Sequence, residues 1–143
     1  MPDPIPWLSA WTALCDRQMQ VGYAALSSDE KSWISIRALI DSVQNGGAIS
    51  YFFNSGADML PDCLRALDEL GAVSVRRNLE RVMALFPAGV PDTMDERNAV
   101  IDSWPDDGRV SARLKDIDAA LMPLVAELDR TLDAFLQRSG LFG

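Results

Sequence analysis

Apolar residues recur at helix-like spacings of three to five positions through most of the chain. Each run ends at turn-forming residues such as glycine, proline, asparagine or aspartate. This periodicity indicates amphipathic helices, and the turn residues mark their boundaries. The pattern predicts six helices, at residues 6–26, 27–44, 61–71, 74–86, 93–104 and 110–138.

Polar residues and a proline mark the starts of three of these helices. Ser27 precedes Glu30 by three positions, and Thr93 precedes Glu96 in the same way. Both pairs match the capping box that satisfies backbone N–H groups at a helix N-terminus. Pro61 fits the first helical position, where a missing N–H loses no hydrogen bond.

The last predicted helix carries an almost heptad-like apolar seam. Steps of three and four positions predict packing along another helix, either within the chain or in a second copy of it. Pro123 lies inside this helix and is expected to kink or break it. The seam consists of Val110, Leu114, Ile117, Leu121, Leu124, Leu128, Leu132 and Phe135.

The length and pattern together predict the fold class. A chain of 143 residues suits one domain with a substantial core. Only residues 49–53 show the alternation expected of a strand, and there it is weak. The chain contains no internal repeat and no interdomain linker. We predict one all-α domain of about six helices over residues 1–143, with the long C-terminal helix kinked or broken near Pro123.

Composition excludes several kinds of chemistry. The chain has no histidine, which excludes Ser-His-Asp and Cys-His catalysis and removes the commonest metal ligand. It has no Gly-rich phosphate loop and no GxSxG or HExxH motif. Cys15 and Cys63 lie too far apart for a structural zinc site and are too few for a disulfide framework. We expect no enzyme activity, no cofactor and no metal.

The N-terminal residues and the hydropathy predict a cytoplasmic protein. The first six residues include three prolines and no positive charge on a side chain, unlike a secretory signal. No apolar run approaches the roughly 20 residues that a membrane span needs. So few cysteines are typical of a reducing compartment. We expect a cytoplasmic location without membrane association.

The chain is acidic, with 21 acidic and 13 basic residues and a net charge of −8. Neutralisation of phosphates supplies most of the affinity for nucleic acids, so direct binding to DNA or RNA is disfavoured. A basic protein partner is favoured, because opposite charges accelerate encounter. The same net charge is also consistent with a small protein whose acidic residues simply keep it soluble.

The run NGGAISYFFNSGAD, residues 45–58, combines polar groups with bulky aromatics, and we name it the aromatic corner. In one interpretation its polar residues cap helix ends, with Asn54 or Ser55 closing a preceding short helix and Asp58 capping the next helix. In the other they line a pocket for a small ligand or a peptide terminus. The candidate binding residues are Asn45, Tyr51, Asn54, Ser55 and Asp58.

The order of several short motifs resembles a known family. The motifs are NGG at 45–47, YFFNSGAD at 51–58, AL at 66–67, LGA at 70–72, LFP at 85–87, VP at 90–91 and ER at 96–97. This order is similar to that of a bacterial all-helical family of mostly unknown function, whose best-described members are DNA-mimic proteins. The resemblance covers about residues 20–125. It implies a small acidic helical protein, often dimeric, and at least one such protein binds a transcription factor in place of DNA.

Two rows of carboxylates are candidates for a DNA-like surface. Helix positions three or four apart bring side chains within about 5–6 Å, so such rows approximate a line of phosphates. Basic residues interrupt both rows, which also fits an ordinary solvated helix surface. The bases are Arg97, Arg109, Arg113 and Lys115 in the first row and Arg130 in the second. The first row comprises Asp92, Asp95, Glu96, Asp102, Asp106 and Asp107, and the second Asp116, Asp118, Glu127, Asp129 and Asp133.

Three functions remain open from the sequence. The first is a non-catalytic acidic interaction protein that binds a basic DNA-binding or regulatory protein in place of DNA. The second is a regulatory module that binds a small ligand or peptide at the aromatic corner. The third is an immunity-type inhibitor of a toxin, which size and charge allow but to which no residue points. A homodimer through the C-terminal seam is compatible with each.

Overall fold

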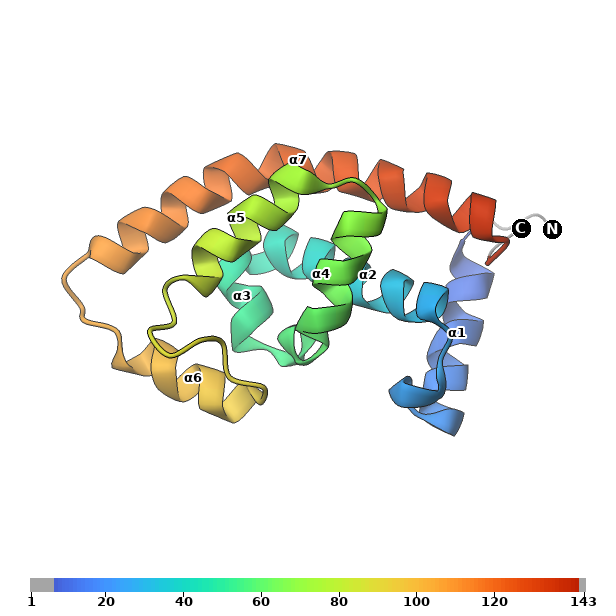
Figure 1. Ribbon diagram of the computed structural model, residues 1–143, viewed down its shortest axis with the longest axis horizontal. Coiled ribbons are helices and arrows are strands. Elements are labelled where there is room, and N and C mark those ends of the chain that lie inside the picture. The colour runs from blue at the N-terminus through green and yellow to red at the C-terminus, as the bar shows by residue number, and fades with distance from the viewer. Residues whose placement is uncertain (1–6, 142–143) are drawn as a thin grey trace.

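The structure is a computed structural model that describes residues 7–141, and in that range every regular element is helical. The predicted all-α fold is confirmed, with seven α-helices where about six were expected (Figure 1). Two short 3₁₀ helices, η1 and η2, connect some of them. The elements are α1 Leu8–Val21, η1 Tyr23–Ala25, α2 Ser28–Gly46, α3 Ala48–Phe53, η2 Ser55–Met59, α4 Leu60–Glu69, α5 Val73–Met83, α6 Met94–Ser103 and α7 Arg109–Ser139.

Helix α7 runs along one side of the molecule and organises the other helices (Figure 1). Helices α2 and α5 pack against α7, and α3 and α4 pack against α2. Helix α6 contacts α3 and η2 at one end of the molecule, and α1 stands at the opposite end (Figure 1). The molecule therefore has a packed centre with one less covered helix at each end.

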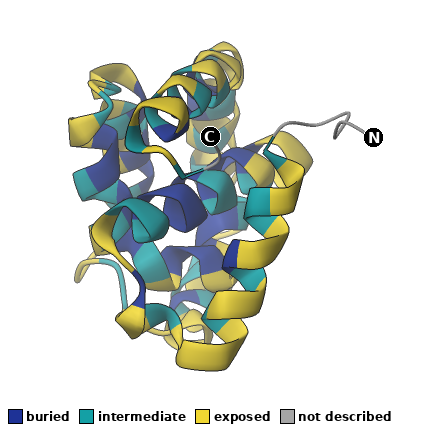
Figure 2. Cartoon of the chain, turned by 90° about the vertical axis from the view of Figure 1, so that its right-hand side faces the viewer, coloured by how far each residue is buried: buried dark blue, intermediate teal, exposed yellow. Residues whose placement is uncertain are grey.

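The core lies where α2, α4 and α7 meet. Ile36 and Ile40 of α2, Leu67 of α4 and Leu121 of α7 are all completely buried. They fall on the apolar faces that the periodicity predicts, because residues three and four apart share one side of a helix. Figure 2 shows buried residues between the helices and exposed residues on their outer sides.

The first helix is shorter than the pattern predicts. Its predicted start at Pro6 lies outside the described residues, and it ends at Val21 instead of Leu26. Gly22 ends it because its φ of 83° is incompatible with a helix. The apolar residues that follow form η1, a single 3₁₀ turn whose spacing resembles that of an α-helix.

Helix α3 is absent from the six helices that periodicity predicts, although the capping interpretation of the aromatic corner implies a short helix before Asn54. It has only six residues, AISYFF, which are too few to show helical periodicity. Its β-branched and aromatic residues account for the weak strand-like alternation. The seventh helix therefore lies within the aromatic corner.

The capping predictions hold fully at one site and in part at another. Ser27 and Glu30 form the complete capping box, with both side-chain-to-backbone hydrogen bonds present. At α6, Thr93 Oγ1 accepts a hydrogen bond from the N–H of Glu96 at 3.3 Å. The Glu96 carboxylate accepts from the Thr93 hydroxyl at 2.8 Å, so the second box lacks its reciprocal bond to the backbone.

Helix α7 continues through Pro123, so the expected break is absent. Figure 1 shows one continuous and gently curved helix. Pro123 cannot donate to the carbonyl of Ala119, one turn earlier, but both residues are exposed and water can solvate that carbonyl. The buried side chains Leu121 and Val125 hold the helix to the core on either side of the proline.

The apolar seam of α7 packs inside the chain. Its buried residues face α2 and α5, the two helices that α7 contacts most extensively. Val125 and Leu136 join the buried set, while Leu124 and Phe135 are only partly buried. Of the two arrangements left open by the heptad-like spacing, packing within the chain is the one observed.

None of the helices within residues 7–141 is long and apolar enough to cross a bilayer.

Candidate functional site

The aromatic corner begins at a sharp turn between α2 and α3. Gly47 makes this turn with φ 80° and ψ 177°, a conformation that side chains other than glycine rarely adopt. A Cβ atom at Gly47 would lie 2.5 Å from Oδ2 of Asp118 on α7. The other oxygen of that carboxylate, Oδ1, accepts a hydrogen bond from the N–H of Ala48 at 2.8 Å. Asp118 therefore caps α3 from a distant part of the chain.

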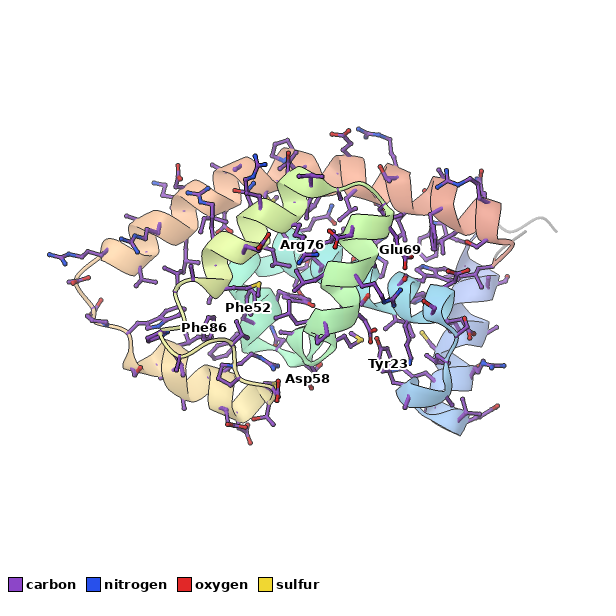
Figure 3. All side chains as sticks on the ribbon, in the orientation of Figure 1. Tyr23, Phe52, Asp58, Glu69, Arg76 and Phe86 are labelled. Atoms are coloured by element: carbon purple, nitrogen blue, oxygen red, sulfur yellow. The ribbon has the colours of Figure 1, made fainter. Side chains whose placement is uncertain are left out.

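A series of aromatic rings connects the corner to α6. Phe52 packs edge-on against Tyr51, with ring centroids 5.3 Å apart, and lies 5.6 Å from Phe86. Phe86 in turn lies 5.3 Å from Trp104 at the end of α6. Phe52 and Phe86 are labelled between α3, α5 and α6 in Figure 3. These rings fill the joint between three helices, as the structural interpretation of the aromatics predicts.

Arg97 of α6 is the polar centre of the joint. Its side chain is fully buried, and all five of its N–H donors are used. Nη2 donates to Oδ1 of Asp58 at 2.6 Å, and the Asp58 side chain remains about half exposed. The other four bonds go to the backbone carbonyls of Phe52 (2.9 Å), Pro91 (3.3 Å), Asp92 (3.1 Å) and Asn54 (3.0 Å).

Arg97 does not interrupt the acidic row as its sequence position predicts, because its side chain is buried; this prediction is wrong. The signal that places it inside is its position relative to its neighbours. Val100, Ile101 and Trp104 lie three, four and seven residues later, so Arg97 belongs to the same helix face as the apolar residues of α6. Those three side chains pack against the core.

The buried groups beneath the corner are suited to packing rather than to chemistry. Tyr51 is completely buried and its hydroxyl makes no hydrogen bond of ordinary geometry, although the Cys63 thiol lies close enough to interact with it. Burial raises the pKa of Tyr51, and the nearby Cys63 raises it further. Burial also raises the pKa of Cys63 to about 12. A thiol held protonated in this way is a poor nucleophile.

The five candidate residues of the corner do not form one pocket. Asn45, Asn54 and Ser55 line a shallow hollow together with Asp41, Ser42 and Ser50. Asp58 lines a different hollow, between η2 and the chain that leads into α6. Tyr51 lines neither, because it lies in the core.

The capping interpretation of the corner is correct for Asn54 and wrong for Asp58. The Asn54 side-chain amide donates to the carbonyl of Ser50 at 2.8 Å, which satisfies a carbonyl in the last turn of α3. Asp58 does not cap α4, whose N-cap residue Met59 makes no side-chain bond. Its carboxylate binds Arg97 because the buried guanidinium needs a counter-charge.

The first acidic row is exposed along α6 and the loop after it. Of the four bases expected to interrupt it, Arg109, Arg113 and Lys115 lie on α7, after the last carboxylate of the row. Arg97 is the only basic residue between positions 92 and 108, and its side chain points inward. Within the described residues, five of the six carboxylates have no ion-pair partner, and the sixth, Asp107, has only a distant one in Arg109 at 3.7 Å. The five are Asp92, Asp95, Glu96, Asp102 and Asp106, all exposed. We name these six residues the α6 surface.

The second acidic row is largely engaged in contacts within the chain. Asp116 pairs with Arg81 at 2.6 Å, and Asp129 pairs with Arg37 at 2.9 Å. Asp118 caps α3, as described above. Of the five carboxylates in this row, only those of Glu127 and Asp133 have no hydrogen bond or ion pair among the described residues. Burial, and then repulsion by Asp129, raise the pKa of Asp133.

The described residues contain no cluster of three or more cysteine, aspartate or glutamate side chains placed to hold a metal ion. Around the corner and α6, the described residues form a charged surface and two shallow hollows.

Comparison with known proteins identifies a family. A family model described as DMP19-like protein matches residues 24–139, from η1 to the end of α7. Helix α1 lies outside the matched range. No curated protein and no solved structure shows a significant match.

Proposed function

We propose that this chain, which belongs to the DMP19-like protein family, acts without catalysis by presenting the α6 surface to a basic DNA-binding or regulatory protein. The observation that supports this proposal is the inward orientation of Arg97. This orientation removes from the outer side of α6 the base that would divide the acidic row, and the half-exposed carboxylate of Asp58 offsets the charge of Arg97. The outer side of this segment consequently carries carboxylates without interspersed cations.

The spacing of these carboxylates suits a partner that binds DNA. Asp95 and Asp102 lie two turns apart on α6, which corresponds to about 10 Å along the helix axis. This is about the rise of three base pairs, over which one DNA strand presents three phosphates. Lysine and arginine side chains that bind phosphates can therefore reach successive carboxylates of α6.

The α7 carboxylates contribute less to the proposed surface. Those that pair with Arg37 and Arg81 or cap α3 have their charge or hydrogen-bonding capacity engaged within the chain. An acidic group that already pairs with a neighbouring base attracts a further cation only weakly, because the local net charge is near zero. The proposed binding surface is thus confined to α6 and the adjoining loop.

The test compares two variants with the same change in net charge. One variant, Asp95→Asn/Glu96→Gln/Asp102→Asn, neutralises the α6 surface. The control, Asp16→Asn/Asp68→Asn/Glu127→Gln, neutralises three exposed carboxylates on α1, α4 and α7. Basic proteins retained at low salt by the immobilised wild type are identified, and their affinity for each variant is measured.

We expect the α6 variant to lose binding and the control to retain most of it. Added duplex DNA should displace the partner, and affinity should fall steeply with salt because the contact is electrostatic. Equal losses in the two variants, or a partner that binds duplex DNA and this chain at the same time, would show that the proposal is wrong.

A second candidate function uses the shallow hollow beside the corner. Asn45, Asn54 and Ser55 line it together, and their uncharged polar groups suit a small polar ligand or a peptide terminus. The test is thermal unfolding in the presence of amino acids and short peptides, with Asn54→Ala as the variant. A ligand that stabilises the wild type and not the variant supports this function, and the absence of any stabilisation removes it.

A further inference from the structure

A hollow with apolar walls lies beside the start of α6. It has a volume of about 420 Å³ and is bounded by η2, α4, the end of α5 and the chain that leads into α6; we name it the Met83 hollow. Ligand pockets have volumes of roughly 300–1,000 Å³, so a side chain of the size of leucine or methionine can enter. Its apolar lining consists of Leu60, Pro61, Leu64, Met83, Val90 and Pro91.

The mouth of the Met83 hollow is acidic. Two acidic residues, Asp58 and Asp92, and no basic residue line it. The Asp58 side chain is 49% exposed and Asp92 is exposed, so both carboxylates are open to solvent. Figure 3 labels Asp58 where η2 approaches the start of α6. Since Arg97 neutralises only one of the two carboxylates, the mouth attracts a cation.

Arg97 holds the two walls of the hollow at a fixed separation. On one side its guanidinium binds the carbonyl of Asn54 and the carboxylate of Asp58. On the other side it binds the carbonyls of Pro91 and Asp92, at 3.3 and 3.1 Å. A hollow whose walls are already tied together costs little ordering when a side chain enters it.

The hollow is continuous with the α6 surface. Asp92 belongs to both, and Asp95 and Glu96 follow it in the first turn of α6. A protein segment that places its basic side chains on these carboxylates therefore passes the mouth of the hollow. Protein interfaces concentrate their binding energy in this way, at a few apolar anchors that a polar rim surrounds.

We infer that the Met83 hollow receives one apolar side chain of the basic partner, of the size of leucine or methionine and flanked by lysine or arginine. The inference rests on the proposed function, because the occupant belongs to the protein that binds the α6 surface. It adds an uncharged contact beside the carboxylates. A DNA phosphate backbone offers no such contact, so part of the affinity for this chain should persist at salt concentrations that screen charges.

The first experiment measures binding of two model peptides to the wild type. Both are capped pentapeptides with four lysines, one with leucine and the other with alanine at the centre. Methyl NMR signals of the protein, labelled with ¹³C at the methionine methyl groups, report where each peptide binds. Met83 lines the hollow, and Met94 at the start of α6 is 38% exposed beside the carboxylates. Met19 on α1 and Met122 on α7 are exposed internal controls.

The leucine peptide should shift the Met83 signal in a saturable way, and the alanine peptide should need about tenfold higher concentration, because it buries less apolar area. The Met94 signal should respond to both peptides, while the two control signals stay unchanged. A Met83 signal that does not move, or that moves equally with both peptides, overturns the inference. A Met83 response without one at Met94 would instead support the hollow and count against the α6 surface.

The second experiment measures the affinity of the partner, found as described above, over a range of salt concentration. Val90→Trp fills the hollow, and Val73→Trp, at a valine 62% exposed on α5, is the matched control. Val90→Trp should weaken binding about tenfold at every salt concentration and leave the salt dependence unchanged, since no charge is lost. The control should bind like the wild type, and circular dichroism verifies that both variants fold.

The salt dependence separates this inference from the proposed function. The neutralising variant Asp95→Asn/Glu96→Gln/Asp102→Asn should reduce the slope of affinity against salt, because it removes ionic contacts. A folded Val90→Trp variant that binds the partner as tightly as the wild type would overturn the inference and leave the α6 surface standing. A neutralising variant with unchanged affinity and slope would overturn the proposed function, whatever the tryptophan variant does.

Discussion

The guanidinium of Arg97 and the carboxylate of Asp58 are joined by a 2.6 Å contact that links α6 to the aromatic corner. One partner is fully buried and the other is half exposed, so the pair places a charge inside the molecule and leaves its counter-charge at the surface. The remaining donors of Arg97 bind four carbonyls of the flanking chain. Arg97 therefore helps to fix the orientation of α6, and with it the α6 surface, relative to the aromatic corner.

Replacing Arg97 by leucine should destabilise the protein strongly. The change removes five hydrogen bonds and leaves buried carbonyls without partners, so we expect a loss of about 3–5 kcal/mol in the free energy of unfolding. Urea denaturation measures this loss. Arg97→Lys retains the charge but supplies three donors, and it should fall between the wild type and leucine.

The control for Arg97 is Arg77→Leu on the neighbouring helix α5. Arg77 is exposed, and surface substitutions of this kind usually change stability by about 0.5 kcal/mol or less. Similar losses for the two leucine variants would contradict a central role for Arg97.

Gly47→Ala should be more harmful than the same change at another glycine of positive φ. At Gly47 the new methyl would meet the Asp118 carboxylate, whose movement would break its hydrogen bond to Ala48. At Gly71, with φ 69°, a Cβ atom would meet nothing within 4 Å. We expect a loss of about 1–2 kcal/mol at Gly71 from backbone strain alone, and about 3 kcal/mol at Gly47.

A double-mutant cycle assigns the additional loss at Gly47. Once Asp118→Ala has removed the carboxylate, Gly47→Ala should cost only the backbone strain. Additive losses would mean that Asp118 does not cause the difference between the two glycines.

The elements that the sequence predicted well are those whose burial follows one helical face. Helices α2, α4 and α5 fall within two or three residues of their predicted ranges, because apolar residues three and four apart identify the buried side. Periodicity did not predict helix α3, since six residues cannot show this period, and only the capping interpretation of Asn54 implied a short helix there. It depends on Gly47 and on Asp118, which lies far away in the sequence.

The candidate site was harder to predict because charge does not reveal orientation. From composition Arg97 is expected to be a surface base, yet its side chain is completely buried beside the corner. Asp118 and Asp129 read as members of an acidic row, yet they serve contacts between helices. The sequence supplies the charges, whereas tertiary contacts determine which of them remain free.

Asp133 should make stability depend on pH in an unusual direction. Burial and the nearby Asp129 raise its pKa in the folded protein, with Arg37 opposing. The folded state therefore binds this proton more tightly than the unfolded state. Stability falls as the pH rises from the ordinary pKa of 3.8 through the raised value. Asp133→Asn should be more stable than the wild type at pH 7, and the difference should shrink towards about pH 3.

Glu30 provides a control of opposite sign. The hydrogen bond from the Ser27 backbone lowers its pKa, so its contribution to stability is present above its ordinary pKa of 4.5 and is lost as the pH falls through the lowered value. Glu30→Gln should therefore be less stable than the wild type at pH 7. Urea denaturation of the two variants across pH measures both effects. A change of stability at pH 7 in the same direction for both variants would contradict the opposite pKa shifts of Asp133 and Glu30.

Substitutions in the α7 seam distinguish a core from a subunit interface. Leu128 is 2% exposed and faces the helices that cover α7. A glutamate there would bury a charge without a partner, so Leu128→Glu should prevent folding at pH 7. Leu124 is only partly buried, and Leu124→Glu should cost about 1–2 kcal/mol. Met122→Glu, at a residue 45% exposed on the same helix, is the control and should change little.

Circular dichroism and sedimentation of these three variants separate the two roles of the seam. If the seam joined two subunits, Leu128→Glu would yield a folded monomer, because each chain would keep its own core. Since α2 and α5 already cover the seam, we expect no folded monomer from this variant. A helical, cooperatively unfolding Leu128→Glu monomer would contradict the packing of α7 described above.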